Sequence, residues 1–307
     1  MSDPILTSAE QLVQRQLVPC PLRPGLHIWL WPGGHSEGWK TAREQAARAV
    51  DLGAAGVIPQ SSLGSARWLS ERDQGDSLPR VEVLRQAGLQ VTAGFGLDGG
   101  HPVGDVVGAL ALGLHVAEGI MGDWEAPSFW ECPSGRRYAS AICDRLLSVE
   151  PDAATRGSDC PWWKPEVHSR APTREFARLF PHRFVQAYGT PGRDNPTECT
   201  EWMYDHAVAS YKRLGISAEF VHPAEQMYGH SLSAAGKLLL HGHSVLALWD
   251  VEEMDRTFRL ALEARRYLLA HDFTATETGL RAFQRNASIA ADGVLGPETL
   301  HALGVTI

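Results

Sequence analysis

The sequence lacks the patterns of several large protein classes. Its five cysteines in 307 residues are widely spread and never form C-x-x-C, which argues against a disulfide framework and against a structural zinc site of the usual spacing. No segment approaches the roughly 18 consecutive apolar residues of a membrane helix. The 28 basic and 36 acidic residues give a net charge of −8, whereas nucleic-acid-binding proteins usually carry a basic face. We therefore expect neither a membrane span nor a nucleic-acid partner.

The N-terminal stretch MSDPILTSAEQLVQRQL has no basic region followed by an apolar core, so no secretory signal is predicted. We expect synthesis in the cytoplasm with reduced thiols. Action outside the cytoplasm would then require release by holins or transport on a particle.

Short apolar runs alternate with helical patterns between residues 26 and 271. The predicted strands are 26–31, 56–60, 89–96, 119–124, 183–189, 218–224 and 244–250. The predicted helices are 37–53, 77–88, 102–117, 136–150, 173–180, 198–215, 233–242 and 254–271. Gly53 is expected to end the first helix, and Ser77 to cap the second. A further strand is expected within residues 152–165, at no assigned position.

This alternation predicts parallel βαβ units. Eight strands in about 245 residues fit a (β/α)8 TIM-like barrel. An open doubly wound sheet is the alternative, although no G-x-G-x-x-G follows the first strand. We assign residues 1–25 to an N-terminal extension, residues 26–253 to the barrel, and residues 254–307 to a small helical module that shares its first helix with the barrel.

The C-terminal residues 274–305 resemble the peptidoglycan-binding domain type 1 of cell-wall hydrolases. The resemblance rests on GLRAFQR at 279–285 and ADGVLGPETLHAL at 291–303. It implies that Phe283 lies in the core of the module, that Gln284 closes a turn, and that Pro297 begins the last helix. The implied wall-binding residues are Phe283, Gln284, Asp292, Gly293, Gly296 and Thr299, and the implied partner is peptidoglycan.

Two acids stand one residue apart in MGDWEAPSFW, at residues 121–130, where the fourth predicted strand ends. Residues i and i+2 of a strand point to the same face, so Asp123 and Glu125 would project together into the barrel mouth, with Trp124 facing the other way. Active sites of such barrels gather at these strand ends. The alternative is that both acids cap the following segment.

The segments 160–189, 214–231 and 245–253 resemble glycoside-hydrolase-like barrels of phage and bacterial cell-wall proteins. The triplet Asp123–Trp124–Glu125 is similar to the D-x-E signature of Chalaropsis-type muramidases. Those muramidases also carry an Asp near the end of the first strand, and LHIWLWPGG at 26–34 has none. The resemblance thus implies a glycosidase, while the departure favours a barrel without turnover.

Glycoside hydrolysis requires a protonated carboxylic acid at the leaving oxygen and a second carboxylate for charge stabilisation. We assign Glu125 as the general acid and Asp123 as its electrostatic partner, which would position the N-acetyl group of a wall sugar. Other residues at predicted strand ends could contact the glycan. They are Asp98, Trp124, Trp130, Gln186, Tyr188, His222, Glu225, Tyr228, Trp249 and Asp250. For any single tryptophan, and for Asp250 at a helix start, a structural role is the favoured interpretation.

Metal and serine chemistry have little support in the sequence. No H-E-x-x-H or G-x-S-x-G occurs, and the tightest histidine group, His241 and His243, precedes the last predicted strand at the stability end of the barrel. We expect no metal and no cofactor. The sequence therefore predicts an endolysin-like peptidoglycan hydrolase. The alternatives are a noncatalytic wall-binding protein of a phage or injection particle, and a zinc-dependent amidase or peptidase.

Overall fold

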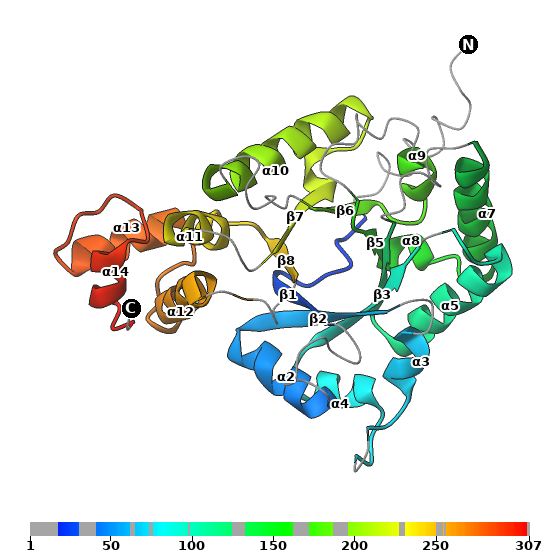
Figure 1. Ribbon diagram of the computed structural model, residues 1–307, viewed down its shortest axis with the longest axis horizontal. Helices are drawn as coiled ribbons and strands as arrows, with labels where there is room; N and C mark the ends of the chain where they lie inside the picture. The colour runs from blue at the N-terminus through cyan, green and yellow to red at the C-terminus, as the bar shows by residue number, and fades with distance from the viewer. Residues whose placement is uncertain are drawn as a thin grey trace.

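The computed structural model describes residues 18–30, 41–61, 65–73, 76–97, 99–124, 133–161, 172–186, 196–226, 231–249, 254 and 256–305. Eight parallel strands form a closed barrel in which each strand pairs with the next and the last pairs with the first (Figure 1). They are β1 (Gly25–Leu30), β2 (Ala54–Ser61), β3 (Gln90–Gly96), β4 (Gly119–Asp123), β5 (Gly157–Asp159), β6 (His182–Gln186), β7 (Val221–Gln226) and β8 (Val245–Trp249). The closed order confirms the predicted barrel and excludes the open sheet.

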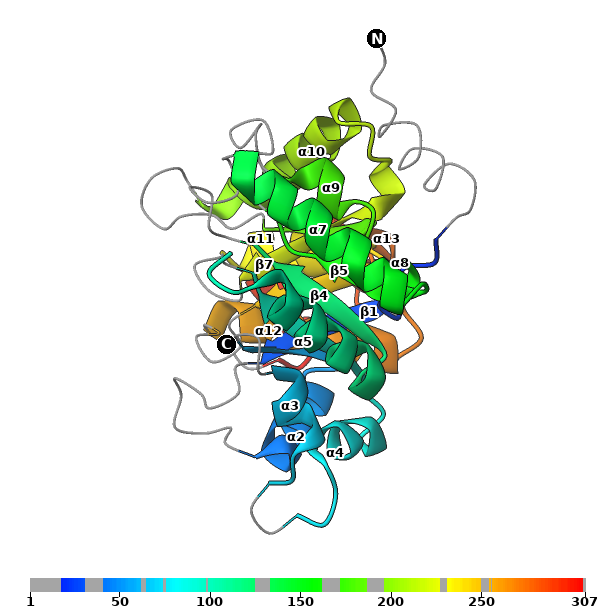
Figure 2. The ribbon, with the colours of Figure 1, turned by 90° about the vertical axis from the view of Figure 1, so that its right-hand side faces the viewer.

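Helices cover the outside of this barrel (Figures 1 and 2). They are α2 (Ala42–Asp51), α3 (Ser65–Ser70), α4 (Arg80–Gln86), α5 (Val103–Val116), α7 (Pro133–Val149), α8 (Ala153–Arg156), α9 (Thr173–Phe176), α10 (Pro196–Arg213), α11 (Leu232–Leu240) and α12 (Arg256–Ala270), with a 3-10 turn, η1, at Ala218–Phe220. The short helices α3 and α8 were not predicted. Within the described residues, no helix has the combination of length and apolar character that a membrane span requires.

Alternation along the strands divides the apolar residues between two layers. One cluster fills the barrel with side chains such as Trp29, Ile58, Met121 and Phe184. Neighbours such as Ile28, Val57 and Ile120 belong to a larger cluster between the strands and the helices, and Val185 belongs to a third cluster with residues of α10. Because successive side chains of a strand point to opposite faces, only every second strand residue can face a ligand at the barrel mouth.

The strand that the sequence could not place is β5, which spans only Gly157–Asp159. All three residues are buried although none is apolar apart from glycine. A Cβ at Gly157 would lie 2.2 Å from the Leu179 carbonyl oxygen, so close backbone packing demands glycine there. Asp159 is buried because it forms an ion pair with Arg183 of β6. Neither requirement produces an apolar run that a sequence pattern could detect.

The first two predicted helices begin later than expected. Ser77 does not cap the second predicted helix: α4 begins at Arg80, after Pro79, without a side-chain cap. The first helix begins at Ala42 rather than at residue 37, and Thr41 and Glu44 form a reciprocal capping box there. The expected end of this helix is confirmed, since Gly53 has a φ of +73°.

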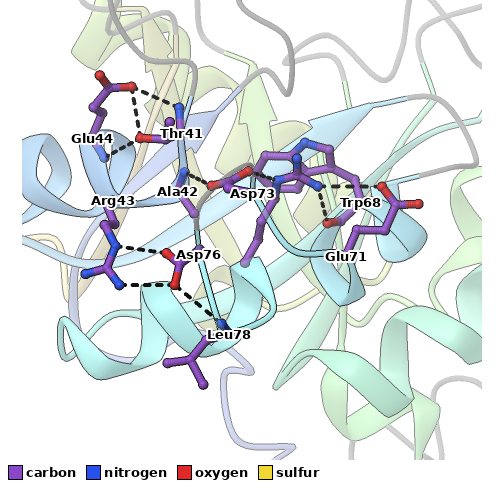
Figure 3. A network of polar contacts seen from close by, with 10 residues as sticks. Thr41, Ala42, Arg43, Glu44, Trp68, Glu71, Asp73, Asp76 and Leu78 are labelled. Atoms are coloured by element: carbon purple, nitrogen blue, oxygen red, sulfur yellow. Dashed lines mark hydrogen bonds and ion pairs between the residues drawn. The ribbon is translucent and has the colours of Figure 1, made fainter.

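Two aspartates connect the start of α2 to the segment before α4 (Figure 3). Asp73 accepts a hydrogen bond of 2.5 Å from the Ala42 backbone N–H and also pairs with Arg80. Asp76 accepts two hydrogen bonds from Arg43, at 2.9 and 3.0 Å. The Asp73 bond satisfies a backbone N–H at the start of α2 from outside the helix, and the Asp76 bonds hold the Arg43 side chain against the same segment.

Residues 18–24 cross the N-terminal end of the barrel, where the strands begin (Figure 1). Gln90 anchors them: its Oε1 accepts from the Arg23 N–H at 2.7 Å, and its Nε2 donates to the Pro21 carbonyl at 2.8 Å. Leu22 inserts into the interior cluster. At least this part of the predicted N-terminal extension therefore belongs to the barrel as its plug.

The C-terminal helices α13 (Glu277–Asn286) and α14 (Pro297–Ala302) lie outside α11 and α12 (Figure 1). Leu280, Phe283 and Leu295 belong to the same cluster as the outer layer of the barrel. A Cβ at Gly236 of α11 would lie only 2.7 Å from Cβ of Leu295. The module is therefore packed onto the barrel through a continuous core.

Candidate functional site

Asp123 ends β4 with its carboxylate in the barrel interior. Met121, two residues earlier, belongs to the interior cluster, while Ile120 belongs to the outer one. The strand is paired up to this point, with Asp123 opposite Gly96, and the Leu97 N–H donates to the Asp123 carbonyl at 2.6 Å. The residue is only 7% exposed. A carboxylate at the C-terminal end of a barrel strand is placed where active sites of this architecture form.

Gln186, at the end of β6, holds this carboxylate across the barrel. Its Nε2 donates to Asp123 Oδ1 at 3.2 Å and to the Cys160 carbonyl at 3.1 Å. Its backbone N–H donates to the Pro161 carbonyl at 2.9 Å. The ends of β4 and β6 and the residues following β5 are thus fixed together. The structure brings the predicted residues Asp123 and Gln186 into direct contact.

Trp124 points to the opposite side of β4, as the alternation predicts. It is 5% exposed, and its ring packs against Phe176 of α9 at 5.6 Å. The indole Nε1 donates to Asp159 Oδ2 at 3.0 Å. These contacts leave Trp124 buried behind the mouth, so its placement supports the positioning of Asp123 and offers no open face to a sugar.

Behind Trp124, Asp159 and Arg183 form an ion pair of 2.6 Å in which both side chains are fully buried. Arg183 also donates to the Thr173 carbonyl at 2.7 Å. Burial raises the pKa of Asp159, and the charge of Arg183 and the Trp124 donor oppose this rise. Neither residue was predicted from the sequence. The only available signal was two charged residues in short buried segments, which periodicity does not distinguish from loop residues.

Two tryptophans lie on the adjacent strands β1 and β8. Trp29 and Trp249 meet edge to face with ring centroids 5.7 Å apart. Trp29 is 2% exposed and contributes to the interior core, whereas Trp249 at the strand end is partly exposed. Among the predicted glycan contacts whose side chains the structure describes, Trp249 therefore remains partly exposed.

Several predicted site residues lie outside the residues that the structure describes. They are Asp98, Glu125, Trp130, Tyr188, Tyr228 and Asp250, together with the side chain of Glu225.

His222 does not line the mouth as predicted. The strand was expected at 218–224, but residues 218–220 form η1 and β7 begins at Val221. His222 is therefore the second residue of its strand and lies at the opposite end of the barrel. There its Nε2 is 2.9 Å from Nδ1 of His182, the first residue of β6.

In the C-terminal module, Gln284 binds the turn before the last helix, as its resemblance implied. Its Nε2 donates to Asp292 Oδ1 at 2.9 Å and to Thr299 Oγ1 at 3.0 Å, and its Oε1 accepts from the Gly293 N–H at 2.9 Å. Phe283, Gln284 and Thr299 are 6%, 0% and 4% exposed. These three residues stabilise the module from inside and cannot themselves form its outer surface. Pro297 occupies the first turn of α14 after Gly296, as expected.

A cleft of about 250 Å³ lies between α11 and this module. Asp292 and Gly293 line it from the module side, and Lys237 lines it from the barrel side. Arg281 and Glu277 also contribute and are joined by a 2.7 Å ion pair. The cleft therefore presents charges of both signs next to the predicted wall-binding turn.

The C-terminal module and the barrel are similar to different known proteins. Residues 273–303 match the sequence family described as "Putative peptidoglycan binding domain". No curated protein matches the chain. Among solved structures, concanavalin B is similar at 14% identity and a TM-score of 0.50, over 77% of this chain and 97% of its own.

Two further barrels show weaker similarity. The Thermobaculum terrenum O-GlcNAc hydrolase mutant has 13% identity and a TM-score of 0.48, over 88% of this chain and 72% of its own. The Bacillus cereus spore cortex-lytic enzyme SleL has 12% identity and a TM-score of 0.42, over 67% and 52%. At these identities the similarity concerns the barrel fold alone.

Proposed function

We propose that this protein is an endolysin-like peptidoglycan hydrolase that cleaves glycosidic bonds of the wall glycan. The observation that carries the proposal is the combination of a peptidoglycan-binding sequence family at 273–303 with a closed barrel onto which this module is packed. The module directs the chain to the wall, and the barrel supplies a mouth with an inward carboxylate on β4.

In this proposal Asp123 is the electrostatic partner and Glu125 the general acid. Asp123 is buried and oriented by Gln186, which is the arrangement needed to stabilise positive charge or to hold a substrate amide at a fixed position. Glu125 follows two residues later in the sequence. A proton delivered by Glu125 to the glycosidic oxygen would complete the acid part of the reaction.

The test is the release of reducing ends from purified peptidoglycan, with free amines measured in parallel. Glu125→Gln should lower the release by about 10²–10⁴-fold, since this is the usual contribution of general acid–base catalysis. Glu263→Gln, an exposed glutamate on α12, is the matched control and should retain wild-type activity. Free amines without reducing ends would instead indicate an amidase or peptidase.

A noncatalytic wall-binding protein is the second candidate, and β1 favours it. The resembled muramidases carry an Asp near the end of this strand, whereas here the inward position near the end is Trp29, packed against Trp249. Absence of both products, with full sedimentation of the chain on peptidoglycan, would establish this candidate. Delivery by phage lysis or on an injection particle would suit either candidate.

We further propose that the cleft beside Gly293 contacts the wall. Lys237 is exposed at its edge, so Lys237→Ala should weaken sedimentation with peptidoglycan several-fold. Lys212→Ala on α10 removes another exposed lysine, outside the cleft, and serves as the control. Equal weakening by the two changes would show only a loss of general charge attraction.

A further inference from the structure

One cysteine and two histidines converge at the N-terminal end of the barrel, remote from Asp123. They come from three separate segments: Cys20 from the plug, His182 from the start of β6, and His222 from the start of β7. One donor atom of each lies within 4.8 Å of the other two. Cys20 is a free thiol. A thiolate and two imidazoles are the ligand set that borderline and soft metal ions prefer.

Two of the three distances between the donor atoms are close to those of a tetrahedral ion, and the third is within 4.8 Å. His222 Nε2 lies 2.9 Å from His182 Nδ1 and 3.8 Å from Cys20 Sγ. Zinc bonds of about 2.0–2.1 Å to nitrogen and 2.3 Å to sulfur place two nitrogens about 3.3 Å apart and nitrogen and sulfur about 3.6 Å apart in a tetrahedron. Each observed distance therefore requires a change of only ~0.2–0.4 Å to accommodate such an ion.

The hydrogen bonds of His182 leave the required nitrogen free of a proton. Its Nε2 is 3.1 Å from the Val18 carbonyl oxygen, which can only accept, so this nitrogen carries the hydrogen and Nδ1 carries the lone pair. In the absence of metal, the Nε2–H of His222 donates to that lone pair. The backbone carbonyl behind His182 is the kind of partner that orients metal-binding histidines.

Burial favours the neutral imidazoles that metal coordination requires. It lowers the pKa of His222 to about 3, with further contributions from His182 and His243, and it also lowers the pKa of His182. Burial raises the pKa of the Cys20 thiol to about 11, so the thiol stays protonated until a cation displaces its proton. Binding would move the His222 proton from Nε2 to Nδ1 and release one proton, that of Cys20, for each ion bound.

We propose that Cys20, His182 and His222 form a three-ligand binding site for a zinc-type transition-metal ion. Cys20 is partly exposed, which leaves an entry side and a fourth position for water. The ion would connect the plug to β6 and β7, across a separation of 202 residues between Cys20 and His222. A link over so long a loop is expected to stabilise the folded chain, and this end of the barrel is the one associated with stability.

The test titrates the metal-free, reduced full-length protein with Zn²⁺ against a chromophoric chelator, and separately with Co²⁺. We expect one equivalent of Zn²⁺ to bind and to raise the melting temperature. Co²⁺ should give a thiolate-to-metal charge-transfer band together with the visible absorption of a tetrahedral site. Cys20→Ser should remove this band and weaken zinc binding at least ~10²-fold, more than the loss of an outer partner usually costs.

A second variant and two controls keep the test decisive. His222→Gln should also abolish the zinc-dependent rise in melting temperature, whether or not it alters the stability of the metal-free protein. Cys143→Ser, at a buried free thiol outside the cluster, and His301→Gln, at an exposed histidine of α14, should leave zinc binding unchanged. The proposal fails if the wild type binds no stoichiometric zinc, or if Cys20→Ser binds it with the same affinity and the same cobalt spectrum.

Discussion

The two ends of the barrel carry different polar groups on the same strands. On β6, His182 begins the strand and Gln186 ends it, and both side chains turn inward with Phe184 between them. His182 joins a neutral group of imidazoles and a thiol under the plug. Gln186 donates to the buried carboxylate of Asp123 at the mouth. A five-residue strand thus separates a site suited to a cation from a site built around an anion.

This difference shows that polarity inside a barrel has to be interpreted by position along the strand. Polar groups where strands begin are closed off by residues 18–24 and contribute to holding the chain together. Polar groups where strands end face the loops in which substrate would bind. We therefore expect substitutions at the mouth to alter catalytic activity and substitutions at the plug to alter the stability of the fold.

The largest expected effect is at the mouth. Asp123→Asn keeps the shape of the side chain and an acceptor for Gln186 but removes the charge. Under the proposed function, we expect reducing-end release to fall by at least about 10²-fold while the melting temperature changes little. The assay on purified peptidoglycan checks the first part, and a thermal melt checks the second. Wild-type turnover by this variant would remove Asp123 from the mechanism.

The next largest effect is expected at the buried Asp159–Arg183 ion pair behind Trp124. Arg183→Met leaves Asp159 buried without its cation, which we expect to lower the free energy of unfolding by about 3–5 kcal/mol. Denaturant titration measures this loss. The double change Arg183→Met with Asp159→Leu removes the stranded charge and should recover part of the stability. If the double variant is no better than the single one, the cost comes from packing and not from the unpaired charge.

The fold was predictable because its signals are repeated. Seven apolar runs and their intervening helices determine the barrel even though β5 gave no signal of its own. The acid on β4 was found because a carboxylate directly after an apolar run is visible in one short segment. Asp159 and Arg183 could not be found in this way, since what allows each to be buried is the other.

The cluster at the plug was missed for a related reason. The sequence directed attention to His241 and His243, which are separated by one residue and do stack on each other, with ring centroids 4.6 Å apart. The convergent donors instead come from residues 20, 182 and 222, which only the closed barrel brings together. Misplacing the start of β7 by three residues was enough to assign His222 to the wrong end.

A smaller effect should appear in the pH dependence of stability. The unfolded chain binds a proton at His222 below about pH 6.5, whereas burial lowers the pKa in the folded state to about 3. His222 therefore does not reduce the free energy of unfolding well above pH 6.5, the pKa of an unfolded histidine. The free energy of unfolding falls as the pH drops below this value, by about 2 kcal/mol at pH 5.

Denaturant titration in chelator at pH 7 and pH 5 checks this expectation. His222→Gln should lose less stability between the two pH values than the wild type, and His301→Gln should retain the wild-type loss. Equal losses in all three proteins would show that the plug end does not control the acid sensitivity.

The smallest effect lies at the module junction, outside both ends of the barrel. Gly236→Ala would place a Cβ within 2.7 Å of Leu295 Cβ, so we expect a loss of about 1–3 kcal/mol from overpacking. Gly108→Ala is the matched control on α5, because nothing lies within 4 Å of its added Cβ, and it should gain about 0.5–1 kcal/mol. Denaturant titration distinguishes these opposite signs. Zinc affinity should be unchanged in both variants, because neither glycine touches the plug. A parallel loss of zinc binding in Gly236→Ala would mean that the module and the N-terminal end are coupled, and the separation of roles drawn above would have to be abandoned.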